Sequence, residues 1–159
     1  MSITLRATRP ADVPLIQRFI QGLAEYEKLS HACVATEAAL AETLFGPRPY
    51  AEIIVAFWND SPAGFALFFH NYSTFLAKPG IYLEDLFVDP EFRGKGLGKA
   101  LLQHLARIAV ERDCGRIEWS VLDWNEPSIQ IYKSLGAVPM DEWTIYRLTG
   151  GALAQLARS

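Results

Sequence analysis

The segment from Tyr82 to Gly98, YLEDLFVDPEFRGKGLG, constrains the fold of this chain more than any other. Its apolar first half predicts a buried strand over residues 81–88, and Asp89-Pro90 predicts the end of that strand. Three glycines at alternate positions follow, and from Lys99 onward apolar residues recur at helical spacing. A glycine-rich turn between a strand and a helix presents backbone N–H groups that lack intrahelical partners at the positive end of the helix dipole. The segment therefore predicts a site for a phosphate or pyrophosphate, although a turn without a ligand fits the same pattern.

The spacing of the glycines excludes two common phosphate-binding motifs. A P-loop ends in Gly-Lys-Ser/Thr, whereas Gly98-Lys99 is followed here by Ala100. The dinucleotide fingerprint G-x-G-x-x-G also fails, because in either register its last position is not a glycine. The pattern that remains is R-x-x-G-x-G, formed by Arg93, Gly96 and Gly98.

A second strand–turn–helix segment occupies residues 116–140. Residues 117–122 predict a strand, and Asn125 is placed to cap a helix over 126–135 that ends at Gly136 in a left-handed conformation. The pattern N-x-x-[AS]-x-x-x-Y-x-x-x-G-[FA] is formed by Asn125, Ser128, Tyr132, Gly136 and Ala137. In this order and spacing, the two motifs resemble those of the GNAT superfamily of N-acetyltransferases, in which the first motif is the acyl-CoA loop.

The resemblance spans nearly the whole chain and is closest to one branch of that superfamily. Four segments look like the spermidine/spermine (diamine) and thialysine acetyltransferases: Leu23–Glu27, Tyr82–Val88, Trp124–Ser128 and Glu142-Trp143. Arg6–Asp12 departs slightly from the family's pattern and is a close variant of its usual opening strand and helix cap. The resemblance implies an acetyl-CoA-dependent enzyme that acetylates a primary amine of a small cationic substrate, either a polyamine or a thialysine- or lysine-like amino acid. It also implies direct attack in a ternary complex and a homodimer. A protein N-terminal or lysine acetyltransferase and a non-catalytic coenzyme A-binding sensor are the alternatives.

The resemblance also implies which residues bind the coenzyme. The strand before the glycine loop would pair its backbone with the pantetheine arm, the loop would hold the pyrophosphate, and the second helix would contribute further contacts. The implied set is Leu86, Phe87, Val88, Arg93, Gly94, Lys95, Gly96, Leu97, Gly98, Lys99, Asn125, Ser128 and Tyr132.

Amine acetylation needs an acceptor for the proton of the attacking ammonium group. A primary amine with a reference pKa near 10.4 costs roughly 4 kcal/mol to deprotonate at pH 7.4. Glu84 is the first candidate for the acceptor, and an anchoring role alone is the alternative. Strand alternation predicts Glu84 and Asp85 on opposite faces, so that Asp85 is either a substrate contact or structural.

The leaving thiolate needs stabilisation, for which the resemblance implies Tyr132. A phenol near pKa 10 is a weaker acid than a thiol near 8.5, so complete proton transfer is uphill by ~2 kcal/mol. We therefore expect Tyr132 to donate a hydrogen bond to the sulfur as charge develops. The catalytic pair is thus Tyr132 and Glu84.

The remaining substrate contacts are also implied by the resemblance. Carboxylates attract ammonium groups, and aromatic faces add cation–π attraction. An amino-acid substrate would in addition need a carboxylate site, which Arg147 or Arg48 would supply. The implied substrate-binding set is Tyr26, Glu27, Glu84, Asp85, Glu142 and Trp143.

Composition limits the class of protein. The 159 residues, half of them hydrophobic, suit one domain over residues 1–159. A net charge of −3 without runs of like charge argues against nucleic-acid binding. The two cysteines, Cys33 and Cys114, lie far apart and show no metal-ligand spacing, so no metal is expected. No apolar run approaches the length of a membrane span and no signal peptide is visible, which predicts a cytoplasmic protein.

The remaining chain predicts an α/β fold on a mixed, mostly antiparallel sheet flanked by helices. Beyond the two motifs, the expected elements are a strand over 3–8, helices over 11–29 and 37–45, strands over 52–58 and 64–72, and short strands near Val138 and over 144–148. From the resemblance, the strand before the glycine loop splays from the strand at 117–122, and the thioester enters the gap.

Overall fold

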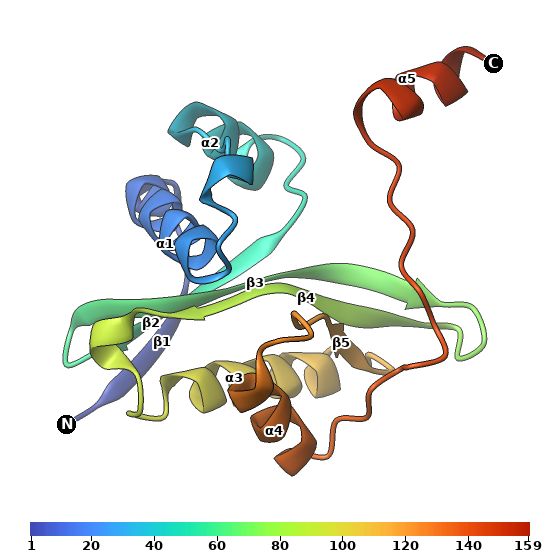
Figure 1. The fold of residues 1–159 in the computed structure, drawn as a ribbon. Coiled ribbons are helices and arrows are strands. Elements are labelled where there is room, and N and C mark those ends of the chain that lie inside the picture. The colour runs from blue at the N-terminus through green and yellow to red at the C-terminus, as the bar shows by residue number, and fades with distance from the viewer. The chain divides into compact units, whose positions relative to one another are not determined.

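The computed structural model describes every residue, Met1–Ser159, as two compact units, Met1–Ser120 and Val121–Ser159. The second unit holds helices α4 (Glu126–Ser134) and α5 (Gly150–Arg158). The first unit holds the sheet and three helices (Figure 1). Its elements are β1 (Ile3–Ala7), α1 (Val13–Tyr26), α2 (Glu37–Phe45), β2 (Glu52–Trp58), β3 (Ser61–Ser73), β4 (Lys78–Val88), α3 (Leu97–Glu111) and β5 (Ile117–Trp119).

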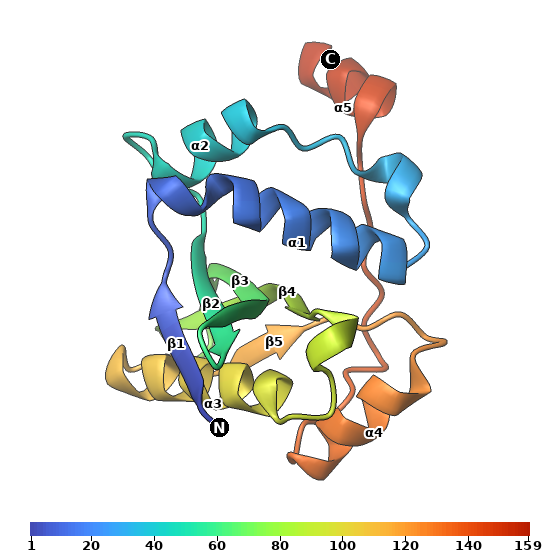
Figure 2. The same ribbon diagram turned by 90° about the vertical axis from the view of Figure 1, so that its left-hand side faces the viewer.

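The sheet has the order β1-β2-β3-β4-β5. Its first three pairings are antiparallel, and only β4 and β5 run parallel. Helices α1 and α2 cover one face and α3 covers the other (Figures 1 and 2). The expected α/β fold with a mixed, mostly antiparallel sheet is confirmed. No helix is both long and apolar enough to traverse a bilayer.

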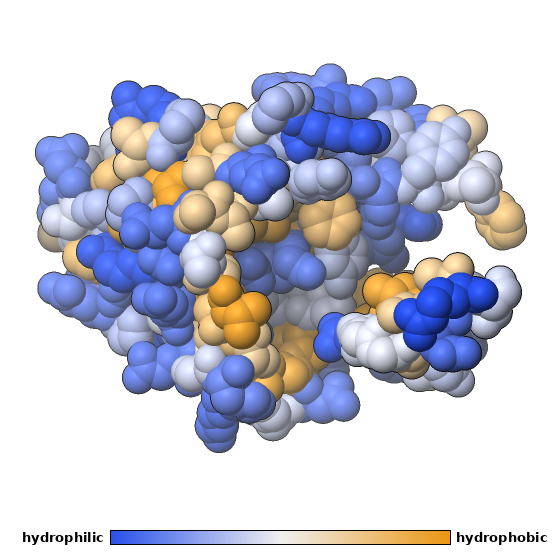
Figure 3. Space-filling model, turned by 90° about the horizontal axis from the view of Figure 1, so that it is seen from above, coloured by the Kyte–Doolittle hydropathy of each residue, from blue (hydrophilic) through white to orange (hydrophobic).

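Two hydrophobic layers hold the helices on the sheet. On the α1/α2 face, Phe19 stacks on Phe65 with ring centroids 5.7 Å apart, and Phe87 packs at a tilt against both rings. On the α3 side, Leu101 and Leu105 are completely buried. Burying each such side chain contributes about 1.5–3 kcal/mol. Figure 3 looks onto the α1/α2 side, where hydrophilic residues dominate the surface with apolar ones between them.

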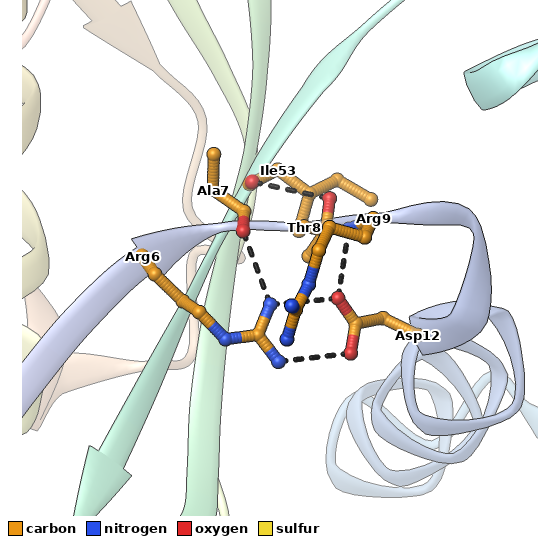
Figure 4. Close-up of polar contacts among 6 residues, drawn as sticks. All are labelled: Arg6, Ala7, Thr8, Arg9, Asp12 and Ile53. Carbon is orange, nitrogen blue, oxygen red and sulfur yellow. Dashed lines mark hydrogen bonds and ion pairs between the residues drawn. The ribbon is translucent and has the colours of Figure 1, made fainter.

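A compact polar corner fixes where α1 begins (Figure 4). The guanidinium of Arg6 donates hydrogen bonds of 2.8 and 3.0 Å to the two carboxylate oxygens of Asp12, and the backbone N–H of Arg9 donates one of 2.7 Å. These contacts, Arg6 foremost, lower the pKa of Asp12 to about 2. Thr8 is tied to the Ile53 carbonyl of β2 through its backbone N–H. The corner therefore connects β1, β2 and α1, and sets the position of α1 over the sheet.

The register of β4 contains a β-bulge. Leu67 of β3 pairs with Asp85, but the next residue, Phe68, pairs with Leu83, which leaves Glu84 as the extra residue. Leu67 packs against the α1/α2 core, so Asp85 opposite it lies on that face as well. The alternation of side chains is thus interrupted at Glu84.

Most predicted elements form within a few residues of their expected limits, but the C-terminal part differs. The strand expected over 117–122 stops at Trp119, and the short strands near Val138 and over 144–148 do not form. A strand needs a neighbour to share its hydrogen bonds, and no strand pairs with these residues. Helix α5 was not predicted, because the glycines Gly150 and Gly151 at its start are typical of a break.

Candidate active site

The glycine loop leaves the first turn of α3 open to a ligand. Gly94 and Gly96 have φ angles of +79° and +88°, in the left-handed region that favours glycine. The first intrahelical bond runs from the Ala100 N–H to the Gly96 carbonyl at 3.0 Å. The N–H groups of residues 97–99 therefore have no protein acceptor. Such a helix start binds anions through its donors and its dipole.

Strand β4 parts from β5 halfway along its length. The parallel pairing runs from Ile81↔Ile117 to Leu83↔Trp119 and goes no further. Residues 84–88 are paired with β3 on one edge and with no strand on the other. This confirms the expected splay of the central strands. Unpaired backbone groups on a sheet edge accept an extended ligand as an added strand.

Three carboxylates meet where the strands part. Burial, then the charges of Glu84 and Glu27, raise the pKa of Asp85 to about 7. Burial and the charge of Glu84 also raise the pKa of Glu27, which follows the C-terminus of α1. The bulge interrupts the alternation on which the expected opposite faces of Glu84 and Asp85 depended, and the charge of Glu84 acts on the pKa of both Asp85 and Glu27. The cluster does not form a metal-binding group.

Arg93 is turned toward α1. Its Nε–H donates a hydrogen bond of 3.0 Å to the Val88 carbonyl. Its guanidinium carbon lies 4.5 Å from the centre of the Tyr26 ring and 5.9 Å from that of Phe87. One face of Tyr26, which the sequence suggested for a substrate ammonium, is therefore covered by Arg93. Lys95 lies over Trp58, with Nζ 5.1 Å from the ring centre.

The second unit carries the other motif. Helix α4 begins after Asn125, whose side chain makes no capping hydrogen bond. Tyr132 lies within this helix, and Ser128 lies in its first turn. Gly136 has a φ of +90°, and the N–H of Ala137 bonds to the Tyr132 carbonyl at 3.1 Å, which confirms the expected left-handed helix end. Glu142 and Trp143 follow in a segment without regular structure.

The structure adds two features that the sequence interpretation missed. The first is the proton-holding capacity of Asp85, which depends on a bulge that no local pattern signals. The second is a cavity of about 550 Å³ between α1 and the end of β4, whose lining includes Arg18, Glu25, Tyr26, Phe87, Asp89 and Arg93. In the sequence, this cavity could have been suspected from Arg18 and Glu25, which lie two helical turns apart and therefore on the same side of α1.

Comparisons with known proteins agree with this geometry. The model of the acetyltransferase (GNAT) family matches residues 20–137. The L-ornithine N5-acetyltransferase NATA1 of Arabidopsis thaliana is 37% identical in an alignment 194 residues long, which covers 94% of this chain and 85% of that protein. The thialysine N-epsilon-acetyltransferase of Bos taurus is 36% identical and covers 98% and 97%. A solved integron cassette protein from the mobile metagenome of V. cholerae superposes with a TM-score of 0.83, at 31% identity over 100% of this chain and 99% of that one.

An open helix start after a glycine loop, a sheet that splits beside it and a family match over three quarters of the chain converge on one assignment. The chain is an N-acetyltransferase and belongs to the acetyltransferase (GNAT) family.

Proposed function

We propose that this chain transfers an acetyl group from acetyl-CoA to a primary amine of a small cationic substrate, by direct attack in a ternary complex. The observation that carries the proposal is the carboxylate cluster of Glu27, Glu84 and Asp85 beside the unpaired edge of β4. Both units, residues 1–159, act in this proposal as one catalytic domain in the cytoplasm.

The residues at the loop and at the strand edge fit acetyl-CoA. The free N–H groups of residues 97–99 suit the pyrophosphate, and the left-handed Gly94 and Gly96 keep side chains away from it. The open edge of residues 86–88 suits the amide-bearing pantetheine arm. When bound, acetyl-CoA supplies an acyl carbon for the amine and a thiolate leaving group. Calorimetric titration of the protein with coenzyme A tests this part, and the absence of binding would refute it.

In this proposal the carboxylate cluster accepts the proton that the ammonium group of the substrate must lose. Glu84 is exposed at the bulge and is the proposed first acceptor, while burial and the charges of Glu84 and Glu27 let Asp85 hold a proton near neutral pH. Because its pKa is raised to about 7, Asp85 can take up a proton near neutral pH, where a carboxyl group with a pKa near 4 would stay ionised. In this proposal Glu84→Gln lowers kcat over the whole pH range, whereas Asp85→Asn moves the acidic limb of the kcat/KM profile. If the pH profiles of kcat and kcat/KM are unchanged in both variants, the cluster only anchors the substrate and does not accept its proton.

Tyr132 is the proposed donor to the leaving sulfur, a role that the family resemblance supports. Removing one such donor costs roughly 10²–10³ in kcat. Tyr132→Phe should therefore keep coenzyme binding, measured by calorimetry, and lose most of the turnover. A variant that keeps full turnover would remove Tyr132 from the mechanism.

The substrates of the relatives direct the choice of amine. Their names specify ornithine and thialysine, and a human spermidine/spermine N(1)-acetyltransferase-like protein is 31% identical over 96% of this chain but only 23% of its own length. We propose a substrate of this size, bound near Tyr26, Glu27, Glu142 and Trp143. Steady-state assays with ornithine, thialysine, lysine and spermidine test the proposal. Inactivity toward all four would contradict it, and coenzyme binding without any turnover would point to a sensor.

A homodimer is part of the proposal. Large apolar side chains between residues 138 and 148 are exposed, and the strand expected over residues 144–148 does not form. A second copy of the chain would cover such a surface. Sedimentation equilibrium should give twice the chain mass of 17.8 kDa, and a monomer at micromolar concentration would refute this part.

A further inference from the structure

The side chain of Arg93 starts from the glycine loop and reaches the end of α1. Its guanidinium carbon lies 4.5 Å from the ring centre of Tyr26, the last residue of α1, and 5.9 Å from that of Phe87. No carboxylate forms an ion pair with Arg93. The contact of its charge with α1 is therefore a cation–π contact with Tyr26.

The Val88 carbonyl fixes the guanidinium in this position. The N–H of Asp89 bonds to the Ala63 carbonyl at 2.8 Å, and Val88 lies opposite Gly64. In an antiparallel ladder, a residue in such a pair directs its own N–H and C=O away from the partner strand, here toward the edge of β4 that β5 leaves open. The Nε–H of Arg93 donates its 3.0 Å hydrogen bond to this outward carbonyl. One side chain thus joins the glycine loop, the open edge of β4 and the end of α1.

Helix α1 lies close enough to β4 for this contact because Gly22 has no side chain. A Cβ added to Gly22 would meet the ring of Phe87 at 2.8 Å. Tyr26 lies one helical turn further on the same side of α1. Glu27, a member of the carboxylate cluster, follows Tyr26 directly. The position of the Tyr26 ring therefore also determines where Glu27 meets the cluster.

Both cations of the glycine loop lie over aromatic rings. Lys95 lies over Trp58 as Arg93 lies over Tyr26. The donors at the start of α3 are the backbone N–H groups of residues 97–99. An anion at this helix start is therefore provided for by the backbone, and the guanidinium of Arg93 is available for a different task.

We propose that Arg93 is a positioning residue for the amine substrate. It holds Tyr26, and through Tyr26 the last turn of α1, beside the open edge of β4 that is proposed for the pantetheine arm. Its charge covers one face of the Tyr26 ring and leaves the opposite face to an ammonium group. This inference rests on the proposed function and assigns Arg93 to the amine, whereas the sequence suggested it for the coenzyme.

Two substitutions distinguish a positioning residue from a pyrophosphate contact. Arg93→Gln removes the charge, whereas Arg93→Lys keeps it but lacks the planar group that bonds to Val88 and stacks on Tyr26 at the same time. Arg93→Gln should raise the KM for L-ornithine roughly 2- to 30-fold, the range of a cation–π contact, and should leave the KM for acetyl-CoA within about twofold of the wild type. Arg93→Lys should restore only part of the ornithine KM.

The opposite pattern would overturn the inference. Lysine is itself a good phosphate ligand, so a pyrophosphate contact would be weakened in Arg93→Gln and restored in Arg93→Lys. An acetyl-CoA KM that follows this pattern, together with an unchanged ornithine KM, would show that Arg93 binds the coenzyme.

A double-mutant cycle tests whether Tyr26 is the residue through which Arg93 acts. Tyr26→Leu removes the ring, so adding Arg93→Gln to it should raise the ornithine KM no further. Arg107→Gln, at an exposed position on α3, is the matched control and should change neither KM. A smaller folded fraction would lower kcat and leave both KM values unchanged. Effects of Arg93→Gln and Tyr26→Leu that multiply would refute the link.

Hydrogen exchange separates this inference from the proposed function. Without any substrate, mass spectrometry of the peptide over residues 19–29 should show faster exchange in Arg93→Gln than in the wild type or Arg107→Gln. Faster exchange in a protein that turns over none of the four amines would support the link to α1 and refute the proposed acetylation. Turnover of ornithine with an unchanged KM and unchanged exchange in Arg93→Gln would refute the inference and leave the proposed acetylation standing.

Discussion

Replacing Asp85 by asparagine should stabilise the protein at pH 8 and hardly affect it at pH 4. The pKa of Asp85 is raised from 3.8 to about 7, so folding is opposed whenever the carboxyl must be charged. Between these two pKa values the folded state holds a proton that the unfolded state has lost, and the unfolding free energy of the wild type therefore falls as pH rises. A shift of about three pKa units corresponds to ~4 kcal/mol.

The gain in the variant will be smaller than this limit, because the asparagine amide must itself be desolvated at about 1 kcal/mol. We expect Asp85→Asn to raise the unfolding free energy by about 2–4 kcal/mol at pH 8 and by less than about 1 kcal/mol at pH 4. For a chain of this length the change corresponds to a Tm increase of roughly 4–16 °C at pH 8. The same variant should also show the moved acidic limb of the kcat/KM profile, since it loses its proton-holding group.

Urea unfolding followed by circular dichroism from pH 4 to pH 8 measures the effect. Glu42→Gln, at an exposed position on α2, is the matched control and should run parallel to the wild type. The reasoning is refuted if the wild-type and Asp85→Asn curves stay parallel over this range, or if the variant is less stable at pH 8.

Three further substitutions test other parts of the structure. Asp12→Asn removes a carboxylate whose pKa is lowered to about 2, so the variant should lose ~2 kcal/mol of unfolding free energy at pH 7, and this loss should vanish as pH falls through 2. Urea unfolding at both pH values measures the difference, and a loss that persists at low pH would contradict the prediction. Gly96→Ala forces a side chain to φ +88°, which should lower the unfolding free energy by about 1–2 kcal/mol in chemical denaturation and weaken coenzyme A binding in calorimetry. If the variant matches the wild type in both measurements, a left-handed glycine is not required here. Gly22→Ala places a Cβ 2.8 Å from the ring of Phe87 and should cost about 1–3 kcal/mol in thermal unfolding; an unchanged Tm would mean that α1 shifts freely on the sheet.

The elements that could be predicted are those whose signals are local. Thr36 caps α2 through a hydrogen bond of 3.1 Å from the Ala39 N–H, as its position before an acidic first turn suggests. The turn between β2 and β3 follows from Asn59 and Asp60, which tolerate the positive φ angles that they adopt. The open first turn of α3 followed from its glycines in the same way.

The elements that could not be predicted depend on distant neighbours. The extra residue at Glu84 is defined only by the pairing of β4 with β3, and a regular strand would have the same amino-acid pattern. The raised pKa of Asp85 is due first to burial and then to Glu84, and Glu27, which lies 58 positions earlier in the chain, adds to it. Likewise, residues 144–148 were expected as a strand from their composition, yet no partner strand is present to pair with them.

The bulge in β4 has a consequence for how easily this protein could lose its activity. Upstream of Glu84 the odd-numbered residues Ile81 and Leu83 share one side of the strand, whereas downstream of it Asp85 and Phe87 occupy the opposite side. Removing Glu84 by a single in-frame codon deletion would therefore restore an unbroken pleat, with every other core residue still facing its own layer. The proposed proton acceptor is thus dispensable for the architecture, and a natural homologue that lacked this one position would be a folded protein without the first carboxylate.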